Sequence, residues 1–115
     1  MQKESTAIFA GRKVVGHVRG DTFYKSIRAS VHMLRKPPAI ALDCQSIADA
    51  EQAGATWAEI LDTESGRVYR ARLETIRRYG TVFNRGFGEQ IYLCLSAWGQ
   101  DVEAEQFALF AEAEV

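Results

Sequence analysis

The sequence is poor in the residue types that build disulfide-rich and metal-binding proteins. It contains two cysteines, Cys44 and Cys94, and two histidines, His17 and His32. Two cysteines fifty residues apart do not make a disulfide framework, so we expect both to be free thiols. A zinc site needs cysteines or histidines in pairs roughly two to four residues apart, and these residues form no such pair. We therefore predict no metal site and no cofactor.

Long hydrophobic runs are also absent. No apolar stretch approaches the roughly 20 residues of a membrane-spanning helix. The first twelve residues lack the apolar segment of a secretory signal. We therefore expect a cytoplasmic protein with no membrane partner.

The motifs of common enzyme classes are missing too. The chain has no glycine-rich phosphate loop, no nucleophile elbow and no His-Glu-x-x-His sequence. The remaining enzymatic hypothesis uses His32 as a base and Cys44 as a nucleophile, with a neighbouring carboxylate. That arrangement depends on contacts that a sequence does not show, so we predict no catalytic residue and rank an enzyme third among the functional hypotheses.

What the chain does have is a strong segregation of charge. At 115 residues, with 47% hydrophobic and 25% charged residues, it has the length and composition of one domain over residues 1–115. Residues 1–36 carry a net charge of +6, residues 37–66 carry −6, residues 67–85 carry +5 and residues 86–115 carry −6, which leaves −1 in total. Such blocks either neutralise one another in the fold or present separate charged surfaces to a partner.

Local patterns predict short strands and one short helix. Residues 22–35 fit either a strand that begins near residue 22 or a helix that ends before Pro37, and we favour the strand. Ser46 and Asp49 have the spacing of a capping box, which predicts a helix of about two turns that ends at Gly54. The other expected elements are strands over 14–18, 39–42 and 90–97 and an acidic helical tail over 101–115, which we expect to dock loosely.

These elements predict a protein of the α+β class. Most neighbouring strands are separated by short turns that contain glycine, which favours antiparallel pairing. We therefore expect a mostly antiparallel sheet of about five or six strands, with one short helix and a C-terminal acidic helix.

One hairpin is specified in detail. Residues 57–62 and 67–73 flank a four-residue loop that ends in Gly66, which suits a turn closing on a left-handed position. This loop length pairs Trp57 with Arg72, Glu59 with Arg70, Ile60 with Tyr69 and Asp62 with Arg67. The pattern places Ala58, Ile60, Tyr69, Ala71 and Leu73 on the core face.

The densest basic stretch follows and is interleaved with aromatic residues. Arginine binds phosphate bidentately and aromatic rings stack on bases, so the mixture favours a nucleic-acid-binding face. The alternative is that these arginines pair with acids inside the fold, as the hairpin register allows for Arg70. Arg77, Arg78 and Arg85 have no obvious local partner and are the stronger candidates. The complete candidate set is Arg70, Arg72, Arg77, Arg78, Tyr79, Arg85 and Phe87.

Residues 85–92, Arg-Gly-Phe-Gly-Glu-Gln-Ile-Tyr, resemble the octamer motif of RNA-recognition-motif domains at their first four positions and at their last. In that family the third and fifth positions are aromatic residues that stack on bases. Phe87 matches the third position, whereas Glu89 occupies the fifth. The resemblance covers eight residues, so it implies a stacking role for Phe87 and no fold. We favour the alternative that Gly86 and Gly88 supply a turn or bulge before a central strand.

A second functional hypothesis is a module for protein interaction or self-assembly. Trp57 and Leu61 fall on the hairpin face away from the core, and tryptophan is enriched at protein interfaces. Segregated charge blocks would let copies of the chain associate, or dock a charged protein partner. Electrostatic association of this kind weakens as salt rises, which separates it from apolar association.

Overall fold

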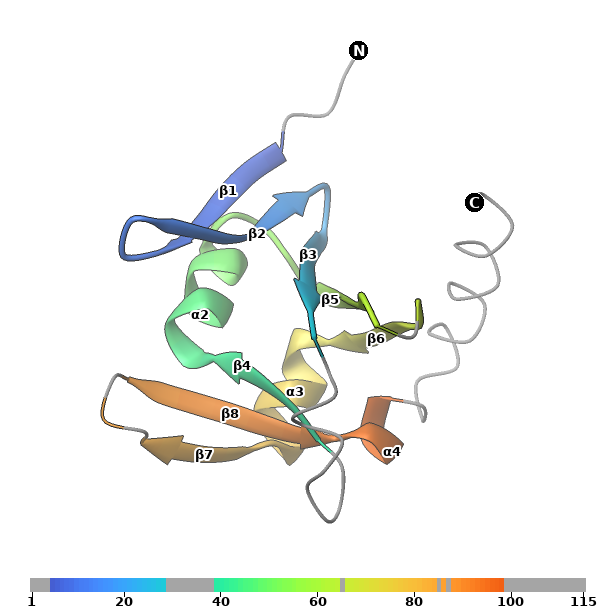
Figure 1. The fold of residues 1–115 in the computed structure, drawn as a ribbon. Helices are drawn as coiled ribbons and strands as arrows, with labels where there is room; N and C mark the ends of the chain where they lie inside the picture. Colours follow the sequence, from blue (N-terminus) through green and yellow to red (C-terminus); the bar gives the residue numbers. More distant parts are fainter. Residues whose placement is uncertain (1–4, 29–38, 65, 85, 87, 99–115) are drawn as a thin grey trace.

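The fold is described here from a computed structural model, for residues 5–28, 39–64, 66–84, 86 and 88–98 (Figure 1). These residues form eight strands and three short helices. The strands are β1 (Ser5–Ala10), β2 (Lys13–Arg19), β3 (Thr22–Ile27), β4 (Ala39–Asp43), β5 (Trp57–Asp62), β6 (Val68–Arg72), β7 (Thr81–Asn84) and β8 (Glu89–Cys94). The helices are α2 (Cys44–Gln52), α3 (Leu73–Tyr79) and α4 (Leu95–Trp98).

The strands form two sheets, which confirms the predicted α+β class. The larger sheet has the order β1-β2-β3-β5-β6, and the smaller has the order β4-β8-β7. All neighbours pair antiparallel except β3 and β5, which run parallel over six residue pairs. The predicted central position of the last strand is confirmed, because β8 lies between β4 and β7.

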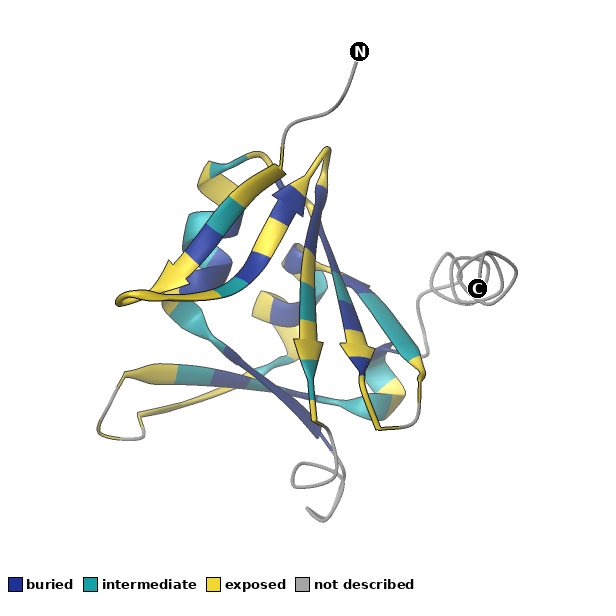
Figure 2. Ribbon diagram, turned by 45° about the horizontal axis from the view of Figure 1, so that its top comes forward, coloured by how far each residue is buried: buried dark blue, intermediate teal, exposed yellow. Residues whose placement is uncertain are grey.

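The core lies between the two sheets, with α2 beside β1 and β2 and α3 beside β6 and β8 (Figure 1). Residues along the strands alternate between this core and the surface, as Figure 2 shows for β2 and β3. The larger sheet contributes Ile8, Val18, Phe23, Ala58, Ile60 and Ala71 to the core, and the smaller sheet contributes Ile40, Leu42, Ile91 and Leu93. We call the opposite side of the five-stranded sheet the outer face.

The β5–β6 hairpin has the predicted register. Trp57 pairs with Arg72, Glu59 with Arg70 and Ile60 with Tyr69. The Asp62 amide donates to the Arg67 carbonyl (2.8 Å), and Gly66 adopts the left-handed conformation with φ 76°. The Asp62 carboxylate also accepts a hydrogen bond from the Glu64 amide (2.9 Å), which fixes the start of the turn.

The helices differ from prediction in two ways. Helix α2 begins at Cys44, two residues earlier than expected, so the predicted capping box is wrong. Ser46 instead lies within the first turn, where its hydroxyl donates to Asp43 Oδ2 (3.1 Å). Helix α3 was not predicted because Leu73 was assigned to the end of a strand. Helix α4 was not predicted because the strand expected over 90–97 ends at Cys94, and residues 95–98 are helical. The expected acidic helix over 101–115 lies outside the described residues.

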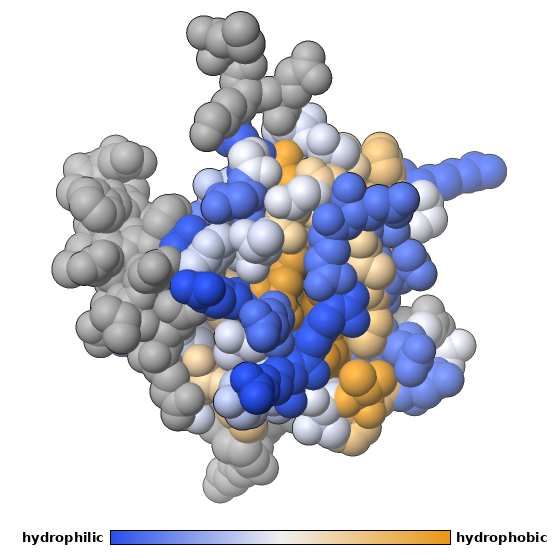
Figure 3. Space-filling view, turned by 180° about the vertical axis from the view of Figure 1, so that it is seen from behind, coloured by the Kyte–Doolittle hydropathy of each residue, from blue (hydrophilic) through white to orange (hydrophobic). Residues whose placement is uncertain are grey.

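The surface combines charged side chains with isolated apolar ones. The large exposed apolar residues are Phe9, Val14, Tyr24, Leu61, Tyr79, Val82 and Phe83. Figure 3, which views the molecule from behind, shows hydrophobic surface bordered by hydrophilic side chains. Among the described helices, none is both long enough and apolar enough to cross a membrane.

Gly80 sets how closely α3 approaches β8, which makes it a test of the packing. Its φ of −74° suits any residue, but an added Cβ would lie 2.5 Å from both the Ile76 carbonyl oxygen and Ile91 Cγ1. We expect Gly80→Ala to lower the free energy of unfolding by about 1–3 kcal/mol, measured by chemical denaturation. Thr81→Ala, at an exposed neighbouring position, should change it by less than about 0.5 kcal/mol. Equal effects from the two variants would contradict this account.

Candidate nucleic-acid interface

Strand pairing assembles the outer face from segments that are distant in sequence. Paired residues share a face, so the register across β2, β3, β5 and β6 defines rows of side chains. One row is Arg19, Thr22, Trp57 and Arg72. The next row is His17, Tyr24, Glu59 and Arg70. With strands about 4.8 Å apart, the backbones of Arg19 and Arg72 lie roughly 14 Å from one another.

Trp57 is the centre of the first row and is covered by arginines. The guanidinium carbon of Arg70 lies 3.9 Å from the ring centroid, and that of Arg72 lies 4.7 Å from it. The predicted contact between Trp57 and Arg72 is therefore confirmed. Trp57 is only 8% exposed, and a cation–π contact of this kind contributes about 0.5–2 kcal/mol. The ring thus has a structural role in holding two arginines over the sheet.

A shallow cleft of about 680 Å³ adjoins Trp57 where β6 passes into α3. It brings together three of the predicted site residues, Arg72, Arg77 and Arg78. Glu51 and Glu74 also line it, so its lining has three arginines and two glutamates. The predicted residues are therefore partly assembled into one site.

Arg77 has a partner that the sequence did not reveal. Its Nε donates to Glu51 Oε2 (2.9 Å), and a second nitrogen of the guanidinium also contacts this carboxylate. These hydrogen bonds raise the pKa of Arg77 above its ordinary value, so the side chain remains charged. Arg77 has no local partner, as expected, but Glu51 binds it from 26 residues away, which makes Arg77 the weaker candidate for binding a ligand.

Arg78 and Tyr79 lie exposed at the end of α3. The Arg78 guanidinium carbon lies 5.8 Å from the Tyr79 ring centroid, and 66% of Tyr79 is exposed. Arg78 forms no ion pair with another described residue. Both groups are therefore accessible to a ligand.

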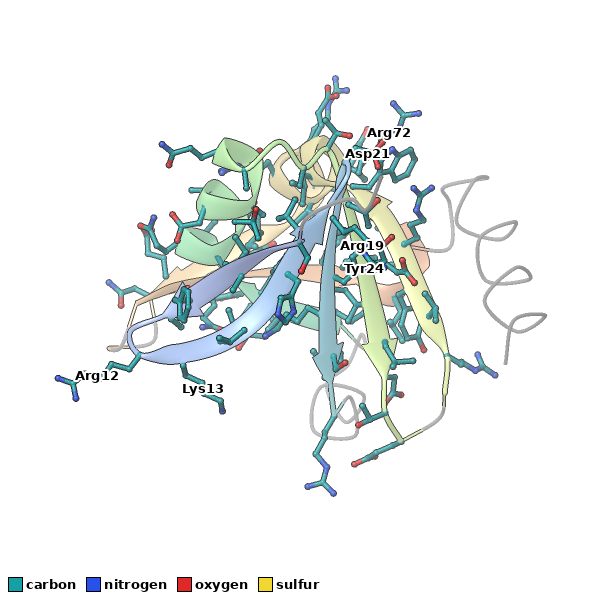
Figure 4. All side chains as sticks on the ribbon, turned by 90° about the horizontal axis from the view of Figure 1, so that it is seen from above. Arg12, Lys13, Arg19, Asp21, Tyr24 and Arg72 are labelled. Atoms are coloured by element: carbon teal, nitrogen blue, oxygen red, sulfur yellow. The ribbon has the colours of Figure 1, made fainter. Side chains whose placement is uncertain are left out.

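Sequence reasoning missed Arg19 and Tyr24, which come from the first basic block. The alternation of apolar and polar residues along 14–18 could have shown which side chains of β2 lie on the outer face. It could not show that arginines of β6 share that face, because this depends on the β3–β5 pairing. Arg19 forms no ion pair within the described part of the chain. Figure 4 shows Asp21 and Arg72 at one end of the sheet and Tyr24 nearer its centre, beside Arg19, while Arg12 and Lys13 project from the tip of the β1–β2 hairpin at the opposite end.

The other predicted site residues divide into two groups. Arg85, Phe87 and His32 lie outside the described residues. Cys44 is described, and burial, followed by the charges of Glu89 and Asp43, raises the pKa of its thiol. A raised pKa disfavours the thiolate that a nucleophilic cysteine requires. The described residues contain no cluster of His, Cys, Asp and Glu suited to a metal ion.

A second cleft opens near the β5–β6 turn. Its volume is about 920 Å³, and it lies between the first half of β2 and the ends of β3, β5 and β6. Leu61, which is 38% exposed, lines it. The predicted interface residues Trp57 and Leu61 therefore border different clefts, and their role at a protein interface stays a prediction.

Removal of one arginine should expose Trp57 while leaving the other tryptophan unchanged. We expect Arg72→Ala to move the indole N–H resonance of Trp57 and to speed its hydrogen exchange, because one side of the ring loses its cover. Trp98 serves as the internal control, since its Nε1 donates to the Leu93 carbonyl (3.3 Å) and its side chain is buried. A Trp57 resonance that does not move in a folded Arg72→Ala protein would count against the stacked arrangement.

Comparison with known proteins leaves the site to be interpreted from its own geometry. No protein-family model matches the sequence. No curated protein and no solved structure matches the chain.

Proposed function

We propose that this protein is a non-enzymatic module that binds single-stranded nucleic acid on the outer face of its larger sheet and on the adjoining part of α3. The binding surface, which we call the basic-aromatic surface, consists of Arg19, Tyr24, Trp57, Arg70, Arg72 and Arg78. The observation that carries the proposal is the cross-strand register, which joins arginines from two separate basic blocks around one aromatic centre.

Phosphate contacts would come from three arginines around this surface. Arg19 and Arg78 are exposed and form no ion pair with another described residue, and Arg72 is exposed above Trp57. Guanidinium groups bind phosphate bidentately and remain charged at all working pH values. Three contacts on a single strand give a slope of about −2 in log affinity against log salt. Affinity should then fall roughly 20-fold when salt rises from about 50 to 200 mM.

Base stacking would fall to the tyrosines. Trp57 is covered by Arg70 and Arg72, so its ring is not available as a platform. Tyr24 is 36% exposed in the centre of the sheet face, and Tyr79 is 66% exposed beside Arg78. Stacking on an aromatic ring contributes about 1–3 kcal/mol per base and requires an unpaired base. This requirement favours a single strand over a duplex.

Acidic groups on or near the basic-aromatic surface limit non-specific binding. Glu59 occupies the row of Tyr24 and Arg70, and Glu51 holds Arg77. The whole chain has a net charge of −1, unlike a dedicated nucleic-acid domain, which is usually basic. We therefore expect moderate affinity that depends on the local surface and not on total charge.

The test is fluorescence anisotropy of labelled single strands and duplexes of roughly 12 nucleotides at about 50 and 200 mM salt. We expect the single strands to bind and the Arg19→Ala/Arg78→Ala double variant to lose about 1.4 from the salt slope. The matched control is Arg12→Ala/Lys13→Ala, which removes the same charge at the opposite end of the sheet (Figure 4) and should bind as the unmodified protein does.

Two outcomes would refute the proposal. One is the absence of binding at low salt. The other is an equal loss of affinity in the two double variants, which would mean that only total charge matters. Equal binding of duplexes and single strands would still support the phosphate contacts but would exclude base stacking on Tyr24 and Tyr79.

A protein-interaction module is the second candidate, and edge strand β7 favours it. All four residues of β7 are exposed, including Val82 (49%) and Phe83 (40%). An exposed edge strand with apolar side chains is a template for pairing with another chain. Light-scattering mass across protein concentration and salt tests self-association. A constant monomer mass would remove the self-assembly form of this candidate.

A further inference from the structure

The larger cleft on the outer face forms because β2 parts from β3. The two strands pair only from His17 opposite Tyr24 to Arg19 opposite Thr22. Before that point β2 pairs with β1 alone, and a bulge opposite Ile8 and Phe9 shifts its register around Val15. Bulges bend the strand that carries them. The gap between the strands is therefore built into the sheet.

The walls of this cleft are mostly apolar. Val14, Val15, Tyr24, Leu61, Val68 and Tyr69 line it, together with Gly16, Ser26 and Gly66. Its volume of about 920 Å³ falls within the range of small-molecule sites, which is about 300–1,000 Å³. The charged or titratable polar side chains that line it are His17, Lys25, Glu59 and Arg67.

Lys25 is the distinctive group in the lining. Its ammonium donates one hydrogen bond, to the Val15 carbonyl across the gap (3.3 Å), and Lys25 forms no ion pair with another described residue. The side chain is partly buried. An ammonium taken partly out of water without a paired carboxylate is unfavourable; the charge of Asp43 offsets part of that cost, and an anionic ligand would relieve the remainder.

We propose that this cleft binds a small molecule with one carboxylate and a compact apolar body. The carboxylate contacts Lys25 in the gap between β2 and β3, and the body lies against Val14, Val15 and Tyr24, which border that gap. The acid is favoured over a neutral molecule because the Lys25 ammonium forms no ion pair with another described residue. This site shares Tyr24 with the basic-aromatic surface but none of its arginines, so it stands whether or not the protein binds nucleic acid.

The pH dependence follows from the surroundings of Lys25. Burial lowers its pKa, the charge of Lys13 lowers it further, and the charge of Asp43 opposes them. The other titratable or charged groups around the cleft are His17, Tyr24, Glu59, Arg67 and Tyr69. Carboxylate binding requires the ammonium form, so affinity should be full below the lowered pKa of Lys25 and be lost as pH rises through it. An ordinary exposed lysine would lose its charge only at higher pH.

The experiment is an NMR titration of amide resonances with benzoate and octanoate as probes, and with benzyl alcohol and octanol as neutral counterparts. We expect the acids to shift the amides of Val15, Tyr24 and Lys25 and to bind at least about tenfold more tightly than the alcohols. Lys25→Met should reduce acid binding by about tenfold or more and leave alcohol binding unchanged. Arg12→Gln removes an exposed charge at the hairpin tip and is the matched control.

Three results would overturn the proposal. These are no shifts with either acid, equal affinity for acids and alcohols, or unchanged acid binding in a folded Lys25→Met protein. If Lys25→Met does not fold, the pH titration of the unmodified protein decides the matter, because acid affinity that stays constant through the titration of Lys25 excludes the contact. The Arg19→Ala/Arg78→Ala variant should bind benzoate normally, which separates this site from the basic-aromatic surface.

Discussion

The parallel pairing of β3 with β5 is the constraint on which the rest of the structure depends. Both ends of the pair are fixed by backbone hydrogen bonds: the Asp21 carbonyl accepts from the amides of Thr56 (2.8 Å) and Trp57 (3.0 Å), and the Ile27 carbonyl accepts from the Thr63 amide (2.9 Å). A parallel pair needs a long connection, and here β4 and α2 supply it. The pairing therefore creates the five-stranded sheet and also places β4 and α2 against its inner face.

The same pairing decides what becomes of the segregated charge. Strand β5 comes from an acidic block, and it lies between β3 from the first basic block and β6 from the second. Part of the charge is neutralised at exposed sites, by Arg77 with Glu51 and by Arg28 with Glu64 (3.7 Å). Exposed pairs of this kind contribute about 0–1 kcal/mol each, so they do little to fix the fold. The sheet pairing places the arginines, and the ion pairs form where it has put them.

Features encoded by neighbouring residues were predictable from the sequence, whereas features that join distant segments were not. The β5–β6 register follows from loop length and from alternation along two adjacent segments. Leu73 was assigned to the strand because it continues the alternation of buried residues that includes Ala71. Ile76, which is buried with Leu73 in α3, fits a loop after a strand as well as it fits a helix. Glu51 lies 26 residues from Arg77, and no local pattern links them. The convergence of Arg19 with Arg72 likewise depends on a pairing that only the folded chain specifies.

The burial of Trp57 changes how its arginines can act. A free arginine side chain loses rotamer freedom when it binds phosphate, at a cost of up to about 2 kcal/mol. Arg70 and Arg72 are already restrained by the Trp57 ring, so part of that entropy is lost on folding and not on binding. Arg72 is exposed, whereas the Nε of Arg70 is buried, so Arg72 is the better placed of the two to contact an anion. The buried Trp57 ring thus restrains the arginines that would contact the ligand.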